Sequence, residues 1–430
     1  MLKKFLLLLL ILPFLFFVSC PENGNNNHQN NNGNENGDGD GNGDGEEPGD
    51  PKYGLSGLTA AQFFAQKGLT LGWNVGNSLD GKSENGWGNP RINKDLLNGV
   101  AAAGFNVLRI PITWHQDADR PIGPAPDYKL NTTRLNRVVA VVDLAYNAGF
   151  KAVIINVHHD GAPNHDTASG DGMFWLDMNG GPEVTAKFSK VWEQIAERFK
   201  DYGDWLIFEG MNEPRPASGD GNWGWNATNA QFDKINEWNQ AFTDAVRGTG
   251  GNNTNRFLVI QPISARAHVV MDQRFVLPND PTPNKQIVSV HWYYPEAFSL
   301  YGTSFAWGTD ADKSVIVNGS SSPNTGDVGF KHYKQKYTDN GIPVIIGECG
   351  ATYQANRGAD LATANDNRIA YLSYLCGQAK THGLVPILWD SGKIDPSSNR
   401  DNFGLFDREF GTQLPETADA ITAMVNAVKN

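Results

Sequence analysis

The segment LIFEGMNEP, residues 206–214, joins a short apolar run directly to a group of polar residues. Similar apolar runs, rich in Val, Ile, Leu and Phe, recur along the chain. They alternate with longer segments of helical periodicity. This alternation is typical of parallel strands that are linked by crossover helices. The sequence predicts eight strands, over residues 70–74, 107–111, 152–157, 206–209, 257–260, 287–291, 344–346 and 385–388.

Segments of helical periodicity lie between these runs, for example over residues 132–148, 185–201, 228–247 and 365–381. Repeated strand–helix units of this number fit a closed (β/α)8 barrel, or TIM barrel, better than an open doubly wound sheet. The β-branched and aliphatic residues inside the runs are explained by packing, because the strands of such a barrel are buried on both faces. We therefore predict an α/β protein with one TIM barrel over residues 55–430.

Polar and aromatic residues follow almost every predicted strand. They are Asn74 and Asn77, Arg109, His158 and His159, Asn212 and Glu213, His291 and Tyr293, Glu348, and Trp389. The active sites of TIM barrels lie at the C-terminal ends of the strands. The shared position of these residues therefore predicts a catalytic mouth at that end of the barrel.

Two carboxylates, Glu213 and Glu348, follow the fourth and seventh predicted strands, so a closed barrel places them across the mouth from each other. Such a pair can flank one glycosidic bond, and in retaining glycosidases the two carboxyl groups are about 5–5.5 Å apart. One carboxylate then attacks the sugar carbon while the other holds a proton for the leaving oxygen. Mutual repulsion raises the pKa of one of them, so the pair can supply an acid and a nucleophile at one pH.

Residues 55–429 resemble glycoside hydrolase family 5 of clan A. The motifs that carry the resemblance are LRIP at 108–111, INVHH at 155–159, NEP at 212–214, HWY at 291–293, GE at 347–348, and Trp389. The residue types that this family requires stand at all eight of the corresponding positions, Arg109, His158, Asn212, Glu213, His291, Tyr293, Glu348 and Trp389. The resemblance implies the TIM-barrel fold and glycosidase activity.

The resemblance also implies a role for each motif residue. Glu213 would protonate the leaving-group oxygen and later act as base on water, while Glu348 would form the glycosyl-enzyme ester. Asn212 would hydrogen-bond the sugar 2-hydroxyl. Arg109 and Tyr293 would donate hydrogen bonds to the nucleophile and keep it anionic and oriented.

His291 would help to position Glu213, and Trp389 would offer a flat apolar face to the sugar ring beside the nucleophile. Further platforms along an open cleft are expected from loop tryptophans, each of which could instead belong to the core. These are Trp223, Trp225 and Trp307. A cleft lined in this way suits internal cleavage of an extended chain.

The first strand and its loop carry the information on the glycan. GWNVGNSLD at 72–80 and WGNP at 87–90 resemble the subgroup of family 5 endo-β-1,4-glucanases that act on cellulose, mixed-linkage β-glucan and often xyloglucan. The resemblance thus implies a retaining endo-β-1,4-glucanase with a β-glucan polysaccharide as its partner. A β-mannanase or xylanase of the same fold is the alternative.

A cluster of imidazoles and carboxylates, His158, His159, Asp160 and His165, has the residue types of a metal site. Adjacent strand residues point to opposite sides, however, and no His-x-x-x-His or Cys pair supplies the remaining ligands. We therefore expect no metal and no other cofactor, and a metal-dependent barrel hydrolase is the less favoured rival. Cys349 is interpreted as a small buried neighbour of Glu348.

The N-terminus has the features of an export signal, with two lysines before an unbroken apolar run over residues 5–18. The run ends in FVSC, which resembles a bacterial lipoprotein processing site at which Cys20 receives a diacylglyceryl group. Residues 21–54 are dominated by Asn, Gly, Asp and Glu, a composition typical of a flexible linker. We predict a lipoprotein signal peptide over residues 1–20 and an exported protein whose membrane contact is this lipid anchor.

Composition limits the remaining classes of protein. The chain has 430 residues, of which 40% are hydrophobic and 19% charged, so a large core is possible. The net charge of -12 without a Lys/Arg stripe argues against a nucleic-acid partner. Three cysteines exclude a disulfide framework, and we expect a monomer.

Overall fold

The computed structural model describes residues 52–115, 122–158, 160, 175–216, 226–320 and 327–429. Several sequence predictions lie outside these residues, namely the signal peptide, the Cys20 anchor, nearly all of the linker, His159, Trp223 and Trp225. Among the helices that the structure describes, none combines the length and apolar character that crossing a membrane requires.

Eight parallel strands form a closed barrel in the order of the sequence, and β8 pairs with β1 to complete it. The strands are β1 Gly72–Val75, β2 Val107–Ile110, β3 Ala152–Asn156, β4 Leu206–Glu209, β5 Leu258–Ile260, β6 Gln286–Trp292, β7 Val344–Cys349 and β8 Leu384–Asp390. Apart from the first residue of β6, nearly every strand residue is buried, as expected for a barrel covered by helices. The predicted TIM barrel is confirmed.

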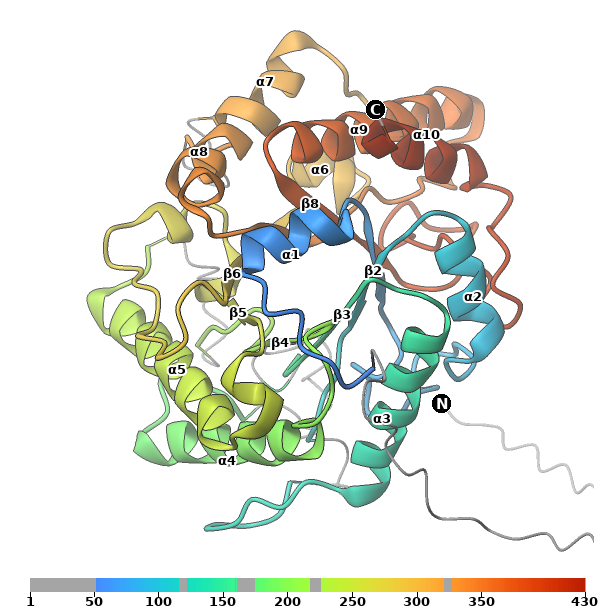
Figure 1. Cartoon of the computed structure of the whole chain (residues 1–430). Helices are drawn as coiled ribbons and strands as arrows, with labels where there is room; N and C mark the ends of the chain where they lie inside the picture. The colour runs from blue at the N-terminus through green and yellow to red at the C-terminus, as the bar shows by residue number, and fades with distance from the viewer. Residues whose placement is uncertain are drawn as a thin grey trace, which may run out of the picture. The chain divides into compact units, whose positions relative to one another are not determined.

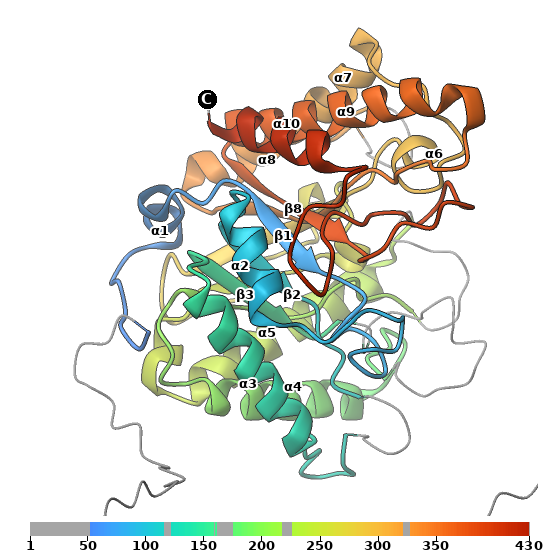
Figure 2. The ribbon, with the colours of Figure 1, turned by 90° about the vertical axis from the view of Figure 1, so that its right-hand side faces the viewer.

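Helices surround the barrel on its outside (Figure 1). They are α1 Ala60–Lys67, α2 Lys94–Ala102, α3 Thr132–Asn147, α4 Pro182–Arg198, α5 Asn229–Gly248, α6 Glu296–Ser299, α7 Asp310–Asn318, α8 Phe330–Lys336, α9 Leu361–Thr381 and α10 Ala418–Lys429. Several begin at a residue whose side chain accepts a hydrogen bond from the first turn, such as Asn93, Asn131 and Thr228. In both views α10 runs beside α9 (Figures 1 and 2).

The two ends of the barrel differ in what covers them. Figure 2 shows α1 at the end where the strands begin, and the arrowheads of β1 and β8 point away from it. The residues predicted to form a mouth stand at or just beyond the last residues of their strands, for example Asn74 in β1 and Glu213 after β4. The fold therefore gathers them at the C-terminal end of the barrel, as TIM-barrel architecture requires.

The packed domain begins before the predicted boundary at Leu55. The carbonyl of Lys52 accepts hydrogen bonds from Trp205 Nε1 at 2.8 Å and from the Gly203 amide at 2.7 Å. Its ammonium group lies 3.0 Å from Asp143, and the carbonyl of Tyr53 accepts a bond from Asn252. The predicted linker, residues 21–54, therefore extends too far toward the C-terminus, because Lys52 and Tyr53 already contact the packed domain.

A β-bulge interrupts β7 at the mouth. Val290 of β6 pairs with Ile346 and His291 pairs with Glu348, so Gly347 has no partner in β6. A bulge of this kind bends a strand and re-aims the side chains that follow it. Glu348 is the first residue after this irregularity, and the bulge therefore sets its direction.

Candidate active site

The two predicted carboxylates meet at the mouth. One carboxylate oxygen of Glu213, one of Glu348 and a ring nitrogen of His291 all lie within 4.8 Å of one another. Carboxyl groups about 5–5.5 Å apart belong to retaining glycosidases, whereas inverting enzymes need about 6.5–9.5 Å to admit a water. The separation therefore fits direct attack by one carboxylate on a sugar carbon.

Glu213 is brought to this position by the turn after β4. The amide of Gly210 donates to Val259 O at 3.2 Å, and the amide of Asn212 donates to Val157 O at 2.9 Å. These bonds connect the turn to β5 and to the end of β3. Because both anchors are backbone atoms of the barrel, the position of Glu213 is fixed by the barrel itself.

Glycine at position 347 allows β7 to approach β6 at the bulge. A Cβ atom there would lie 2.5 Å from Ser289 Oγ and 3.2 Å from His291 Nε2. Real Cβ atoms do not approach another heavy atom as closely as the first distance. The absence of a side chain thus lets Glu348 and His291 share the same level of the mouth.

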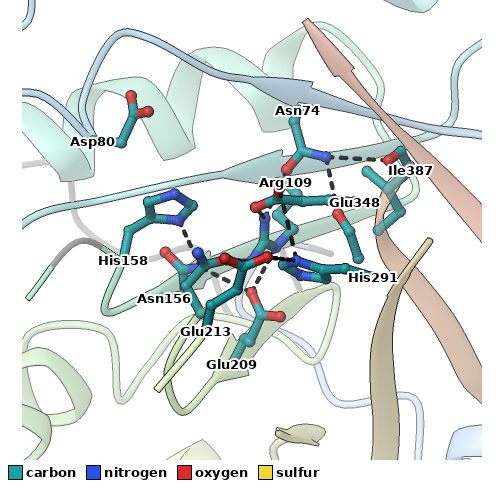
Figure 3. A network of polar contacts seen from close by, with 12 residues as sticks. Asn74, Asp80, Arg109, Asn156, His158, Glu209, Glu213, His291, Glu348 and Ile387 are labelled. Atoms are coloured by element: carbon teal, nitrogen blue, oxygen red, sulfur yellow. Dashed lines mark hydrogen bonds and ion pairs between the residues drawn. The ribbon is translucent and has the colours of Figure 1, made fainter. Parts of the chain in front are cut away.

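Arg109 of β2 lies at the centre of the polar network (Figure 3). Its Nη1 donates to Glu348 Oε1 at 3.1 Å and to Asn74 Oδ1 at 2.9 Å. Its Nη2 donates to Asn212 Oδ1 at 2.7 Å, and its Nε donates to Glu209 Oε2 at 2.6 Å. The guanidinium is completely buried and each of its nitrogens has an acceptor, so its orientation is fixed.

The other donors of the site divide between the two carboxylates. Tyr293 donates its hydroxyl to Glu348 Oε2 at 3.2 Å, and burial raises its pKa so that it keeps its proton. His291 Nδ1 lies 2.7 Å from Glu213 Oε1 and 3.7 Å from Glu348 Oε2. Arg215 Nη1 lies 3.3 Å from the second oxygen of Glu213.

The protonation of the pair depends on His291. Burial would raise the pKa of Glu213, but the hydrogen bond and positive charge of a protonated His291, with help from Arg215, lower it to about 2. Burial, together with the charge of Glu213, raises the pKa of Glu348. A charged His291 therefore keeps Glu213 without the proton that a general acid needs.

A neutral His291 reverses this balance. The positive charge beside Glu213 is then absent, while Arg109 and Tyr293 still donate to Glu348 and favour its anion. Because two close carboxylates repel each other, one of them keeps a proton, and Glu213 is then the better site for it. We assign the proton to Glu213 in this state on the basis of the donor geometry.

The residues predicted after β1 shape the rim of the mouth. Asn74 donates to the carbonyl of Gly347 at 2.9 Å, which ties β1 to the bulge beside Glu348. Asn77 adopts a left-handed backbone with φ of 52°, and its amide donates to Asp80 Oδ2 at 3.0 Å. Asp80 is fully buried, and burial raises its pKa to about 6.

Trp389 stands at the end of β8 and is partly exposed, as a sugar platform must be. Its ring lies parallel to that of His158, with the centroids 5.8 Å apart. Gly76 passes against the indole, where a Cβ atom would lie 2.6 Å from Trp389 Cζ2. The His158 ring and the Gly76 backbone thus both restrict the orientation of the indole.

Trp307 does not belong to this surface, and its prediction as a cleft platform is wrong. It is 7% exposed and packs against two tyrosines of α9, edge-on to Tyr371 at 5.3 Å and tilted to Tyr374 at 5.8 Å. An indole buried against α9 in this way has no face available to a sugar. The alternative that the sequence left open, a core position, holds instead.

Cys349 and Cys376 are both free and buried. Burial raises the pKa of the Cys349 thiol well above its ordinary value, so it is not a thiolate. The interpretation of Cys349 as a small buried neighbour of Glu348 agrees with this environment.

Sequence reasoning missed three residues that support the site, Glu209, Asn156 and Gln261. Glu209, the last residue of β4, accepts hydrogen bonds from Arg109, from Asn156 at 3.0 Å and from Gln261. A charged residue at the end of an apolar strand was a usable signal, because a buried carboxylate needs a partner. Its place two residues before Met211 also puts it next to the predicted mouth.

A barrel whose mouth holds two close carboxylates, one of them fixed by an arginine and a tyrosine, defines the class of retaining glycoside hydrolases. A family model described as Cellulase (glycosyl hydrolase family 5) matches residues 69–394. The chain belongs to glycosyl hydrolase family 5 and is a glycoside hydrolase.

Relatives within the family cover most of this chain. It is 36% identical over 363 residues to endoglucanase B of Clostridium cellulovorans, covering 83% of this chain and 74% of that protein. It is 31% identical to a xyloglucan-specific endo-beta-1,4-glucanase of Bacteroides ovatus, covering 87% of this chain and 71% of that protein. A solved GH5-4 broad specificity endoglucanase from Bacteroides salanitronis is 33% identical, with a TM-score of 0.73 over 87% of this chain and 97% of that one.

Proposed function

We propose that the protein is a retaining endo-β-1,4-glucanase that cleaves β-glucans by double displacement. The observation that carries the mechanism is the carboxylate pair, whose oxygens lie within 4.8 Å of each other on β7 and after β4. Endoglucanases and a xyloglucan-specific endoglucanase among the relatives support the bond type and the internal mode of attack.

In the first step Glu348 attacks the anomeric carbon while Glu213 gives its proton to the leaving oxygen. The C–O bond to the leaving sugar breaks, and an ester between the glycan and Glu348 forms. Arg109 and Tyr293 hold the attacking carboxylate as an anion and fix both of its oxygens. In the second step Glu213 takes a proton from water, which displaces Glu348 and restores the original configuration.

Asn212 binds the sugar through its amide nitrogen. Its Oδ1 already accepts from Arg109 Nη2 at 2.7 Å, so the NH2 group is the part of the side chain that remains for the substrate. An amide donor at this point suits the 2-hydroxyl of the sugar that reacts with Glu348. Such a bond strengthens as positive charge develops on the neighbouring carbon.

The preferred glycan is cellulose-type, mixed-linkage or xyloglucan β-glucan, with mannan and xylan as the alternatives. The sequence at residues 72–80 and the relative with broad specificity support this choice. Release of reducing sugars from carboxymethyl-cellulose, barley β-glucan, tamarind xyloglucan, xylan and mannan tests it. A fast fall of viscosity at low sugar release marks internal cleavage, and activity confined to mannan or xylan would overturn the assignment.

A chelator distinguishes this mechanism from the metal-dependent rival. Among the described residues, Glu213, His291 and Glu348 form the one group of His, Cys, Asp or Glu whose ligand atoms could reach a single ion. These three are engaged in the carboxylate mechanism through the contacts described above. Activity is expected to survive exhaustive chelation, and its loss with recovery on adding one metal would favour the rival.

We also propose that the protein is exported and anchored to a membrane by a lipid on Cys20. The support is the sequence alone, with its basic start, apolar run and FVSC motif. An acyl anchor followed by a polar linker would hold the barrel near a membrane without inserting it.

A further inference from the structure

Glu209 is a buried charge that the proposed mechanism does not use. It is the last residue of β4, has no exposed surface and therefore cannot touch a substrate. Its Oε2 accepts from Arg109 Nε at 2.6 Å and from Asn156 Nδ2 at 3.0 Å, and its Oε1 accepts from Gln261. The carboxylate is thus held by side chains from β2, from β3 and from the segment after β5.

The guanidinium of Arg109 transmits this position to the reacting groups. It is planar, so an acceptor that fixes Nε also fixes the directions in which Nη1 and Nη2 point. Those two nitrogens meet Glu348 at 3.1 Å and Asn212 at 2.7 Å. Figure 3 shows Arg109 between Glu209 on one side and Glu348 on the other.

The charge of Glu209 matters as much as its position. Burial lowers the pKa of Arg109, but the charge of Glu209, followed by that of Glu348, more than offsets this and raises it. One buried cation therefore serves two carboxylates. If Glu209 were neutral, the whole positive charge would act on Glu348 and stabilise its anion further.

We propose that Glu209 is a positioning residue for the nucleophile, which acts through Arg109 to orient Glu348 and to limit how strongly its anion is stabilised. This inference rests on the proposed role of Glu348. It predicts that loss of the charge at residue 209 makes Glu348 a weaker base and a weaker nucleophile, and lets the guanidinium rotate. Both effects slow formation of the glycosyl-enzyme.

The test is the pH dependence of kcat/KM for Glu209→Gln with an aryl β-cellobioside whose leaving group is activated. The acid limb of this profile reports proton uptake by the coupled catalytic groups of the free enzyme, and Glu348 is the one among them whose protonation removes the nucleophile. A lower pKa of Glu348 moves that limb to lower pH, by about one unit if a nearby charge is lost. We expect this shift together with a fall in kcat/KM of about tenfold to a hundredfold.

A matched control separates positioning from general stability. Arg247 and Asp280 form another buried pair, with Nε–Oδ1 at 2.8 Å and Nη2–Oδ2 at 2.6 Å, between α5 and the segment before β6. Asp280→Asn removes the same charge from the same kind of pair outside the mouth. It is expected to lower the melting temperature while leaving kcat/KM and the pH profile as in the parent.

Glu209→Asp keeps the charge but withdraws it from Arg109. This variant should have the acid limb of the parent but a lower kcat/KM. If Glu209→Gln does not fold, the kcat/KM of Glu209→Asp tests the proposal. The proposal is overturned if Glu209→Gln has the parental profile, if Asp280→Asn shifts the profile equally, or if Glu209→Asp has parental kcat/KM. A parent enzyme inactive on the cellobioside and on every β-glucan polymer would instead refute the proposed function and not this inference.

Discussion

Replacing Gly347 by alanine should disturb the site although it adds one methyl group. The new Cβ would lie 2.5 Å from Ser289 Oγ and 3.2 Å from His291 Nε2, and neither atom has a hydrogen-bond partner among the described residues. Ser289 is fully buried, so its hydroxyl must rotate into packed surroundings or β6 and β7 must separate at the bulge. Overpacking of this kind costs about 1–3 kcal/mol of stability.

The same displacement acts on catalysis, because Glu348 follows Gly347 directly and His291 contacts Glu213. A shift of about 1 Å in a reacting group can cost a hundredfold in rate. We therefore expect Gly347→Ala to lose about 1–3 kcal/mol in urea unfolding and at least tenfold in kcat on barley β-glucan.

Two further variants make this prediction specific. Ser289→Ala removes the nearer of the two clashing atoms, so the double variant should recover part of the loss. Gly377→Ala in α9 places its Cβ 3.7 Å from Ala427, an ordinary contact, and should gain about 0.5–1 kcal/mol as glycine leaves a helix. Parental stability and kcat in Gly347→Ala, or no coupling to Ser289→Ala, would refute the account of the bulge.

Three other predictions follow from the contacts and the sequence. His291→Asn removes the imidazole contact that lowers the pKa of Glu213, so that pKa rises and the basic limb of the kcat/KM profile should move to higher pH; an unchanged limb or movement to lower pH would contradict the assignment. Deletion of residues 1–51 should leave turnover and melting temperature unchanged, since residues 21–51 contain no aliphatic side chain that could pack on the barrel, and a loss of half the activity would show that the deleted part docks. Cys20→Ala should release the protein from the membrane fraction or block its processing, and unchanged membrane fractionation would exclude the lipid anchor.

The barrel was predictable because each apolar strand and each helical segment is visible in the local sequence, and the pair repeats along the chain. The predicted fourth strand, 206–209, has the observed bounds of β4, and the other predicted strands overlap β1 to β3 and β5 to β8. β7 and β8 extend beyond their predicted ends, to Cys349 and Asp390. Polar residues at a strand end look like loop in a single sequence, whereas the ladder continues through them in the barrel.

Contacts that join distant segments were not predictable to the same extent. Strand ends and family motifs located Arg109 and Glu348, but the bridge from Arg109 to Glu209 depends on the barrel bringing β2 and β4 to the same level. Trp307 was predicted wrongly for the same reason. Its place in a loop suggested an exposed ring, but the ring packs on α9. Side-chain direction in a loop is decided by tertiary packing, which a single sequence does not specify.

The division of roles between the two glutamates is the central claim, and the products formed with azide test it most directly. With an activated aryl β-cellobioside, Glu348→Gly should react only when azide fills the vacated space, and the product should be the α-glycosyl azide of inverted configuration. Glu213→Ala should still form the glycosyl-enzyme, and azide should release it as the β-glycosyl azide of retained configuration. Proton NMR of the anomeric signal distinguishes the two. An inverted product from the Glu348 variant with a retained product from the Glu213 variant is the predicted result, and a retained product from Glu348→Gly would contradict the account.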